Sequence, residues 1–291
     1  MMIRCVIAIL LLFRLYVARA QSADEWVYLD NGTLRLGVNK TAGACVGFLS
    51  AGTDGPSVLN SFDRGRFVQQ SYYGAPDGSK WVENPWRYNP VQGGDWHGKP
   101  AVVLEFRSDD TKLYAKTKPL HWATGAEIQE MTMEEWIELK GCLVRIRFRM
   151  AYSGEMEHPV HHQEIPAFFV QPELGTLVLY DGDEPWTGGE LTRRQPGFPN
   201  EAAKLSEHWA AWVDRNDQGV GLYVGVADRA TCYRYGNGVI RKDSCSYIAP
   251  LAEFALKPGL VWEYDAWITL GSVKEIRERF GALHADKEDS K

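Results

Sequence analysis

The sequence lacks the features of a membrane protein and of a nucleic-acid-binding protein. Beyond the first 20 residues no apolar run is long enough to span a bilayer, so we expect no membrane insertion of the remaining chain. The chain has 32 Lys and Arg against 38 Asp and Glu, and this net charge of −6 argues against nucleic acid as a partner. An acidic small substrate stays open, because a local basic patch can coexist with a negative total.

Several motifs of catalysis and metal binding are missing as well. There is no glycine-rich phosphate loop, no G-x-S-x-G nucleophile elbow and no C-x-x-C pair of the kind that binds zinc. We therefore predict no cofactor. The acidic turn Asp181–Glu184 leaves a structural calcium ion possible.

The first 20 residues are typical of a cleavable secretory signal peptide. Arg4 precedes an uncharged run from Cys5 to Phe13, and Ala18 and Ala20 are the small residues of a cleavage site. The apolar run is too short for a membrane anchor. We expect a secreted or periplasmic protein whose exported part starts at Gln21.

Cysteine is scarce in the exported part. Cys45, Cys142, Cys232 and Cys245 allow two disulfides in three pairings, and four buried thiols are an equally good interpretation. Cys232 and Cys245 flank a turn-like segment at 234–238, so a disulfide across a hairpin is one expectation.

Short alternating runs of apolar and polar residues dominate the rest of the chain and predict antiparallel strands. The clearest runs are 34–38, 101–106, 136–139, 143–148 and 219–224. Only 273–280 has helical spacing, with Val273, Ile276 and Phe280 on one side. We predict an all-β sandwich over 21–285 with a short C-terminal helix, followed by a disordered tail over 286–291. Residues 71–100 break the strand pattern and predict a long elaborated loop.

Residues 63–97 combine amides, charges and aromatic rings, as carbohydrate sites do. Sugar C–H faces stack on aromatic rings, while sugar hydroxyls need convergent polar partners. The alternative is that the rings fill a core and the polar groups cap loops. The predicted substrate-binding residues are Arg64, Arg66, Gln70, Tyr72, Tyr73, Trp86, Asn89, Gln92, Trp96, His97 and Trp122.

A second segment contains His161, His162 and Glu164. In a strand His162 and Glu164 share one face, whereas His161 and Gln163 share the other. A face with histidine and glutamate suits proton transfer, since histidine titrates near neutral pH. A metal site and a purely structural role are the alternatives.

The candidate catalytic residues are His162, Glu164, Asp95, Asp63 and His161. Glycoside hydrolysis needs two carboxylates, for which Asp63, Asp95 and Glu164 are the candidates. β-Elimination from a uronic acid needs a base and cationic partners, which Tyr72, His162, Arg64 and Arg66 provide. Hydrolysis is slightly favoured.

The order of these landmarks resembles the galactose mutarotase-like superfamily, which includes the aldose 1-epimerases. The resemblance rests on Gly65-Arg66, on the strand 143–150 leading into 158–169, and on the closing segment 250–267. It implies a β-supersandwich in which Arg66 contacts sugar hydroxyls and His161 or His162 faces the sugar. The late catalytic glutamate of the epimerases has no convincing equivalent, with Glu253 nearest by position.

Together these patterns predict an exported carbohydrate-active enzyme that acts on an oligo- or polysaccharide. Glycoside hydrolysis is the first hypothesis and polysaccharide lyase activity the second. A non-catalytic carbohydrate-binding module and a secreted mutarotase are further alternatives.

Overall fold

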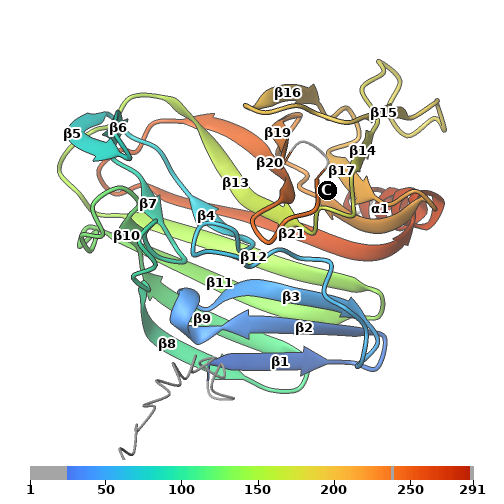
Figure 1. Cartoon of the computed structure of the whole chain (residues 1–291), viewed down its shortest axis with the longest axis horizontal. Helices are drawn as coiled ribbons and strands as arrows, with labels where there is room; N and C mark the ends of the chain where they lie inside the picture. The colour runs from blue at the N-terminus through green and yellow to red at the C-terminus, as the bar shows by residue number, and fades with distance from the viewer. Residues whose placement is uncertain (1–24, 237–238, 289–291) are drawn as a thin grey trace, which may run out of the picture.

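Antiparallel sheets form most of the chain in the computed structural model, which describes residues 25–236 and 239–288. A nine-stranded and a seven-stranded sheet face each other (Figure 1). A three-stranded sheet adjoins the smaller one through an isolated bridge between Val46 and Val68. The predicted all-β antiparallel β-supersandwich is confirmed. The predicted signal peptide, residues 1–20, lies outside the described residues.

In both large sheets, strands that are neighbours in space often lie far apart in the chain. In spatial order, the nine-stranded sheet contains β15 (Thr192–Arg194), β14 (Thr176–Leu179), β17 (Trp209–Val213), β18 (Gln218–Tyr223), β21 (Val261–Ser272), β12 (Leu143–Tyr152), β11 (Met131–Lys140), β9 (Lys112–Lys118) and β8 (Val102–Ser108). The seven-stranded sheet contains, again in spatial order, β10 (Leu120–His121), β7 (Pro90–Val91), β4 (Gln69–Ser71), β13 (His161–Val170), β20 (Cys245–Phe254), β19 (Arg229–Tyr235) and β16 (Glu201–Lys204). The three-stranded sheet contains β1 (Trp26–Asp30), β2 (Leu34–Asn39) and β3 (Cys45–Ala51), and the short 3-10 helix η1 (Lys40–Ala42) joins β2 to β3.

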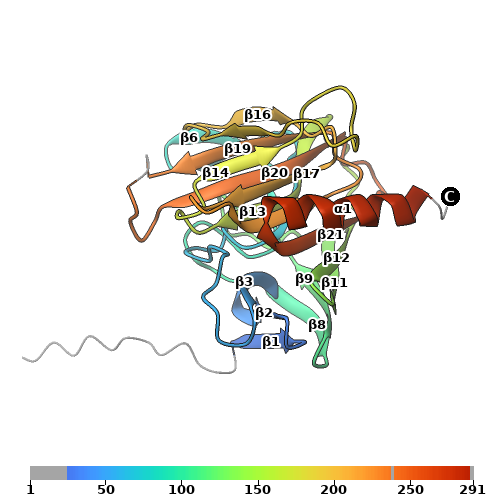
Figure 2. The same ribbon diagram turned by 90° about the vertical axis from the view of Figure 1, so that its right-hand side faces the viewer.

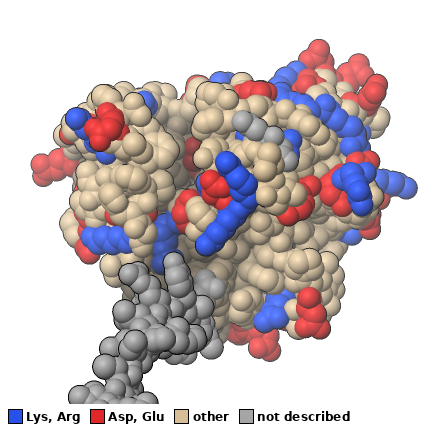
Figure 3. Space-filling view, in the orientation of Figure 1, with Lys and Arg blue, Asp and Glu red and all other residues tan. Residues whose placement is uncertain are grey.

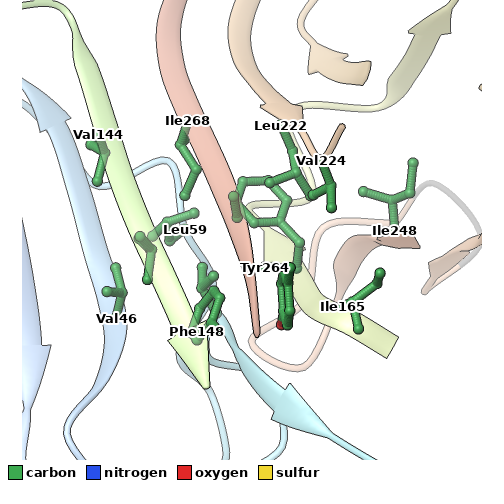
Figure 4. Packing of buried hydrophobic residues seen from close by; sticks show 14 of the residues in the cluster. Val46, Leu59, Val144, Phe148, Ile165, Leu222, Val224, Ile248, Tyr264 and Ile268 are labelled. Atoms are coloured by element: carbon green, nitrogen blue, oxygen red, sulfur yellow. The ribbon is translucent and has the colours of Figure 1, made fainter. Parts of the chain in front are cut away.

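One hydrophobic core fills the space between the sheets (Figure 4). Alternation places Val144, Ile146 and Phe148 of β12 in this core, and the arginines between them lie on the outer face of the sheet. The ring of Phe148 lies 5.2 Å from that of Tyr264 on β21. Each large apolar side chain buried in this way contributes roughly 1.5–3 kcal/mol to stability.

Helix α1 (Val273–Glu288) covers part of the outer face of the nine-stranded sheet (Figure 2). Ile276 and Phe280 pack there against Trp209 and Tyr223, so the predicted apolar side of the helix is confirmed. Gly221 on β18 permits this close packing, since a Cβ there would come within 2.4 Å of Ile276.

The helix runs further than the pattern at 273–280 indicates. It continues to Glu288, into the segment 286–291 where we expected a disordered tail, and residues 289–291 lie outside the described part. Among the described residues, no helix has both the length and the apolar character needed to cross a membrane.

The prediction of one long loop over 71–100 is wrong. This segment contains a hairpin of β5 (Pro76–Trp81) and β6 (Asn84–Arg87), followed by β7. The prediction missed the hairpin because its strands are mostly exposed and show little apolar alternation. Within the described part the hairpin pairs with no other strand.

The expected disulfide between Cys232 and Cys245 is also wrong, because all four cysteines of the described chain are free. Cys232 pairs across the strands with Ile248, and Cys245 pairs with Tyr235. The two thiols therefore lie on opposite faces of the sheet, one in the central core and one in a separate apolar cluster.

Candidate functional site

A groove of about 430 Å³ lies on the face of the seven-stranded sheet that points away from the core. Figure 3 shows a furrow between the lobe that carries β5 and β6 and the rest of the molecule. Alternation along β13 sends Glu164 into the groove and Gln163 toward the core. An irregularity between Glu164 and Phe168 shifts the register, so that Ala167 and Phe169 line the groove as well.

Aromatic rings form both walls of the groove. On one side Trp81 lies 4.8 Å from Trp86 and 5.9 Å from Trp122, measured between ring centroids. On the other side Phe198 contacts Tyr233 and Tyr235 at 5.4 and 5.5 Å. Aromatic walls with polar groups between them suit the apolar faces and the hydroxyls of a sugar.

Glu164 is the acidic group at the floor of the groove. Its Oε1 accepts a hydrogen bond of 3.0 Å from the phenol of Tyr73. Burial raises the pKa of Glu164 above its ordinary value, and the contacts with Tyr247 and Tyr73 only partly oppose that effect. A carboxyl group with a raised pKa holds its proton more readily than an exposed glutamate does, which suits a group that donates and recovers a proton.

Asp63 and Arg66 lie at one end of the groove. Arg66 Nε is 3.2 Å from Asp63 Oδ2, and the Arg66 guanidinium lies over the rings of Phe62 and Tyr235. Gly65 between them leaves room for Trp122, because a Cβ at this position would come within 2.7 Å of that ring. The Gly65-Arg66 pair that carries part of the family resemblance is therefore part of the groove wall.

The histidines lie at the other end. A second cavity of about 330 Å³ is lined by His162 and Glu164, which lie on the side of β13 opposite the buried Gln163, and also by His161, which we expected to share the face of Gln163. The ring Nε2 of His162 contacts Glu253 Oε1, and Arg229 binds the same oxygen at 3.1 Å. The structure thus brings Glu253, the nearest match by position to the late glutamate of the epimerases, next to His162 rather than to Glu164.

Seven of the predicted residues line the main groove or its floor: Asp63, Arg66, Tyr73, Trp86, Asn89, Trp122 and Glu164. Asn89 is nearly buried and orients a wall residue, because its Oδ1 accepts a hydrogen bond of 3.2 Å from Trp86 Nε1. Its amide group donates to Ser71 Oγ and to the Tyr72 carbonyl.

Three predicted binding residues are buried in the core instead of lining the groove. Gln70, Tyr72 and Gln92 have no solvent exposure and bond to one another, with Tyr72 Oη donating to Gln70 Oε1 at 2.9 Å. The Gln70 amide also donates to the Glu134 carbonyl at 3.2 Å. Their polar groups are satisfied within the protein, as buried polar groups must be.

Four more predicted residues stabilise the loop around 93–99 and do not line the groove. Asp95 Oδ1 accepts from Lys99 N at 2.7 Å, and Trp96 Nε1 donates to the Ala123 carbonyl at 3.2 Å. The ring of His97 lies 4.0 Å from that of Trp96, and Arg64 donates to Thr41 Oγ1 and the Gly98 carbonyl. Asp95 is therefore a loop-capping residue in the structure, and not a carboxylate of the groove.

Sequence reasoning missed the far wall and part of the floor. These residues are Gln69, Phe169, Phe198, Asn200, Tyr233, Tyr235 and Tyr247. A signal was present in the spacing of Tyr233 and Tyr235, which places both rings on one face of a strand.

No group of three or more His, Cys, Asp or Glu that could hold a metal ion occurs among residues 25–236 and 239–288. In the acidic turn, Asp183 instead pairs with Lys204 at 2.8 Å and Asp181 accepts from Thr192 at 2.7 Å. The groove offers its ligand carboxyl, phenol, amide and guanidinium groups, which can bind hydroxyls and move protons.

No protein-family model and no curated protein sequence matches the chain. Solved structures match it in shape. A candidate aldose 1-epimerase from Escherichia coli K12 is 11% identical with a TM-score of 0.55, over 85% of this chain and 99% of that one. A galactose mutarotase related enzyme from Lactobacillus acidophilus is 11% identical with a TM-score of 0.54, over 85% and 97%.

A galactose mutarotase-like protein from Lactobacillus casei is 12% identical with a TM-score of 0.53, over 84% of this chain and 99% of that one. At such low identity the likeness shows the fold alone. These matches agree with the resemblance carried by the sequence landmarks. The chain therefore has the galactose mutarotase-like fold, as a distant representative.

Proposed function

We propose that the chain is an exported enzyme that cleaves or modifies a glycan, with Glu164 as its proton-transfer group. The observation that carries this proposal is a carboxyl group of raised pKa, bonded to Tyr73, on the floor of a groove with aromatic walls. A protein that only bound sugar would not need this group, because an ionisable side chain is costly to bury. The signal-like start of the sequence supports a substrate outside the cytoplasm.

The favoured reaction is glycoside hydrolysis. Protonated Glu164 gives its proton to the glycosidic oxygen as the bond from the anomeric carbon to that oxygen breaks. A water molecule attacks the anomeric carbon, and a second carboxylate takes the proton that the water loses. Asp63, held by Arg66 at 3.2 Å, is the carboxylate in the same groove that suits this role.

The second candidate is β-elimination from a uronic acid, and the contact between Tyr73 and Glu164 favours it. A base removes the proton next to the sugar carboxylate, and the glycosidic oxygen leaves with a proton from the acid. The sugar gains a carbon–carbon double bond, and no water is consumed. The two reactions therefore share Glu164 but give different products.

Glu164→Gln tests the proposal, with Glu138→Gln as the matched control on the outer face of the nine-stranded sheet. We expect the first variant to lose turnover by roughly 10²–10⁴-fold on a panel of polysaccharides, and the second to keep it. Reducing-end release and ultraviolet absorbance of unsaturated ends separate hydrolysis from elimination.

Each result has a definite meaning. Full turnover in Glu164→Gln would show that Glu164 is not the proton-transfer group. A parent protein that binds glycans without turning any over would be a binding module. Faster exchange of the anomers of free aldoses, measured by polarimetry, would make it a mutarotase.

A further inference from the structure

The second cavity continues the groove beyond Glu164. It shares Tyr73, Trp86, Glu164 and Asn200 with the main groove. A glycan that passes over Glu164 therefore extends from the aromatic walls into a space lined by Arg87 and the two histidines. The chemistry of this space differs from that of the main groove.

Arg87 of β6 is a cation without a counter-charge. No Asp or Glu of the described chain forms an ion pair with it, and its guanidinium lies 6.0 Å from the ring centroid of Trp86. The neighbouring His162 differs, because its ring is already bonded to Glu253. A guanidinium keeps its charge at every physiological pH, so the positive charge of Arg87 is available to a ligand.

A further feature makes this cavity favourable for an anion. Glu164 is the acidic residue that lines it, and the raised pKa of Glu164 reduces the negative charge there. Burial and the neighbouring Arg87 lower the pKa of the His161 ring, so the permanent positive charge in the cavity is that of Arg87. A locally cationic cavity is notable in a chain with a net charge of −6.

We propose that this cavity is a subsite for the carboxylate of an acidic sugar, with Arg87 as its ionic partner. This inference rests on the proposed function, because it names the substrate class of the same groove. The planar guanidinium matches a carboxylate through two parallel hydrogen bonds. Asn200 donates to Thr231 Oγ1 at 2.9 Å on the same cavity wall, where these two residues can bind sugar hydroxyls.

The test compares binding of acidic oligosaccharides with binding of their methyl esters, in which a small neutral group replaces each charged carboxylate. Oligogalacturonides, oligomannuronides and oligoglucuronides are titrated calorimetrically at low and at high salt. We expect at least one acid to bind at least tenfold more tightly than its ester at low salt. Arg87→Gln should bring that ratio close to one.

Arg35→Gln is the matched control, because Arg35 also lies over an aromatic ring, 4.2 Å from the centroid of Tyr28, but on the three-stranded sheet. It should keep the ratio of the parent protein. Equal binding of acids and esters throughout, or an unchanged ratio in Arg87→Gln, would overturn the subsite. A sulfated galactan oligosaccharide that binds more tightly than every uronide would overturn the choice of carboxylate.

The subsite and the proposed function fail in different ways. If the parent turns over neutral polysaccharides and shows no preference for acids, only the subsite is refuted. If no glycan is turned over but acids still bind through Arg87, the subsite stands and the enzymatic proposal falls.

Discussion

The phenol of Tyr73 donates a 3.0 Å hydrogen bond to Glu164 on the floor of the aromatic groove. Burial raises the pKa of both groups, so at neutral pH the phenol keeps its proton and the carboxyl group retains one more readily than an exposed glutamate. The hydrogen bond itself lowers the pKa of Glu164, because it stabilises the charged carboxylate. Tyr73 thus tunes the group that we propose to transfer protons.

Tyr73→Phe should move the pH dependence of turnover. Without the phenol the carboxylate loses a donor, so the pKa of Glu164 rises further and the alkaline limb of the activity profile shifts to higher pH. Tyr114→Phe is the control, since Tyr114 donates at 2.7 Å to Glu134, away from the groove. A shift to lower pH in Tyr73→Phe would contradict this role, as would an equal shift in Tyr114→Phe.

Trp81→Ala should weaken glycan binding by about tenfold, which corresponds to the loss of about 1.4 kcal/mol of ring contact. Trp81 is partly exposed in the groove wall, and removing it leaves the core unchanged. Trp136→Ala on the outer sheet face is the control and should bind as the parent does. Calorimetric titration measures the glycan affinity of both variants. An equal loss of affinity in the two would mean that the glycan does not bind in the groove.

Glu135→Gln should change how stability depends on pH. Burial raises the pKa of Glu135 to about 8, and the contact with Gln92 only partly opposes that effect. The folded protein holds this proton between pH 4.5 and 8 while the unfolded chain releases it. The free energy of unfolding therefore falls as pH rises through this range, by about 1 kcal/mol per unit.

The glutamine variant lacks this titration, so the difference between its free energy of unfolding and that of the parent should grow in its favour from pH 5 to pH 8. Urea unfolding at several pH values measures this difference, with Glu138→Gln on the same strand as control. Parallel pH profiles for the parent and Glu135→Gln would show that Glu135 is already ionised in the fold.

Glu207→Gln should destabilise the fold by about 3 kcal/mol. Glu207 is fully buried. Its carboxylate oxygens accept hydrogen bonds from the guanidinium of Arg277 on α1 at 2.6 and 3.0 Å and from Trp209 Nε1 at 2.8 Å. Removing the negative charge leaves Arg277 without its partner in a mostly buried place. Glu278→Gln in the exposed pair with Lys274 should change stability by less than about 0.5 kcal/mol.

The same ion pair predicts a loss of stability in acid. Burial on its own would raise the pKa of Glu207, but Arg277 and Trp209 lower it below the usual value. Its contribution is complete above pH 4.5 and disappears as pH falls through the lowered pKa. Denaturant unfolding between pH 3 and 6 should show this loss in the parent and not in Glu207→Gln.

Alternation in the sequence predicted the sandwich and placed His162 and Glu164 on one face, because period-two spacing is a local property. It did not decide which of two neighbouring side chains faces the groove. Gln69 lines the groove and Gln70 is buried in the core, although we predicted Gln70 as the binding residue. That choice depends on which face of β4 is covered, and residues far away in the chain determine this.

The aromatic far wall could not be predicted for a related reason. Tyr233 and Tyr247 pair directly across β19 and β20, and Phe198 contacts Tyr233 from a separate loop. Only the register of the strands and the path of that loop bring these rings opposite Trp81. A single sequence shows that these aromatic residues are present, but it does not show which strands pair or in which register.

The β5–β6 hairpin contributes Trp81, Trp86 and Arg87 to the two cavities, yet it pairs with no other strand of the described part and bonds to the sandwich through Asp77 and His121 at 2.7 Å. One wall of the groove therefore belongs to a segment outside the large sheets, whereas the floor and the far wall belong to the sandwich itself. A change in the length or sequence of this hairpin would reshape that wall and leave the strand pairing of the sandwich intact.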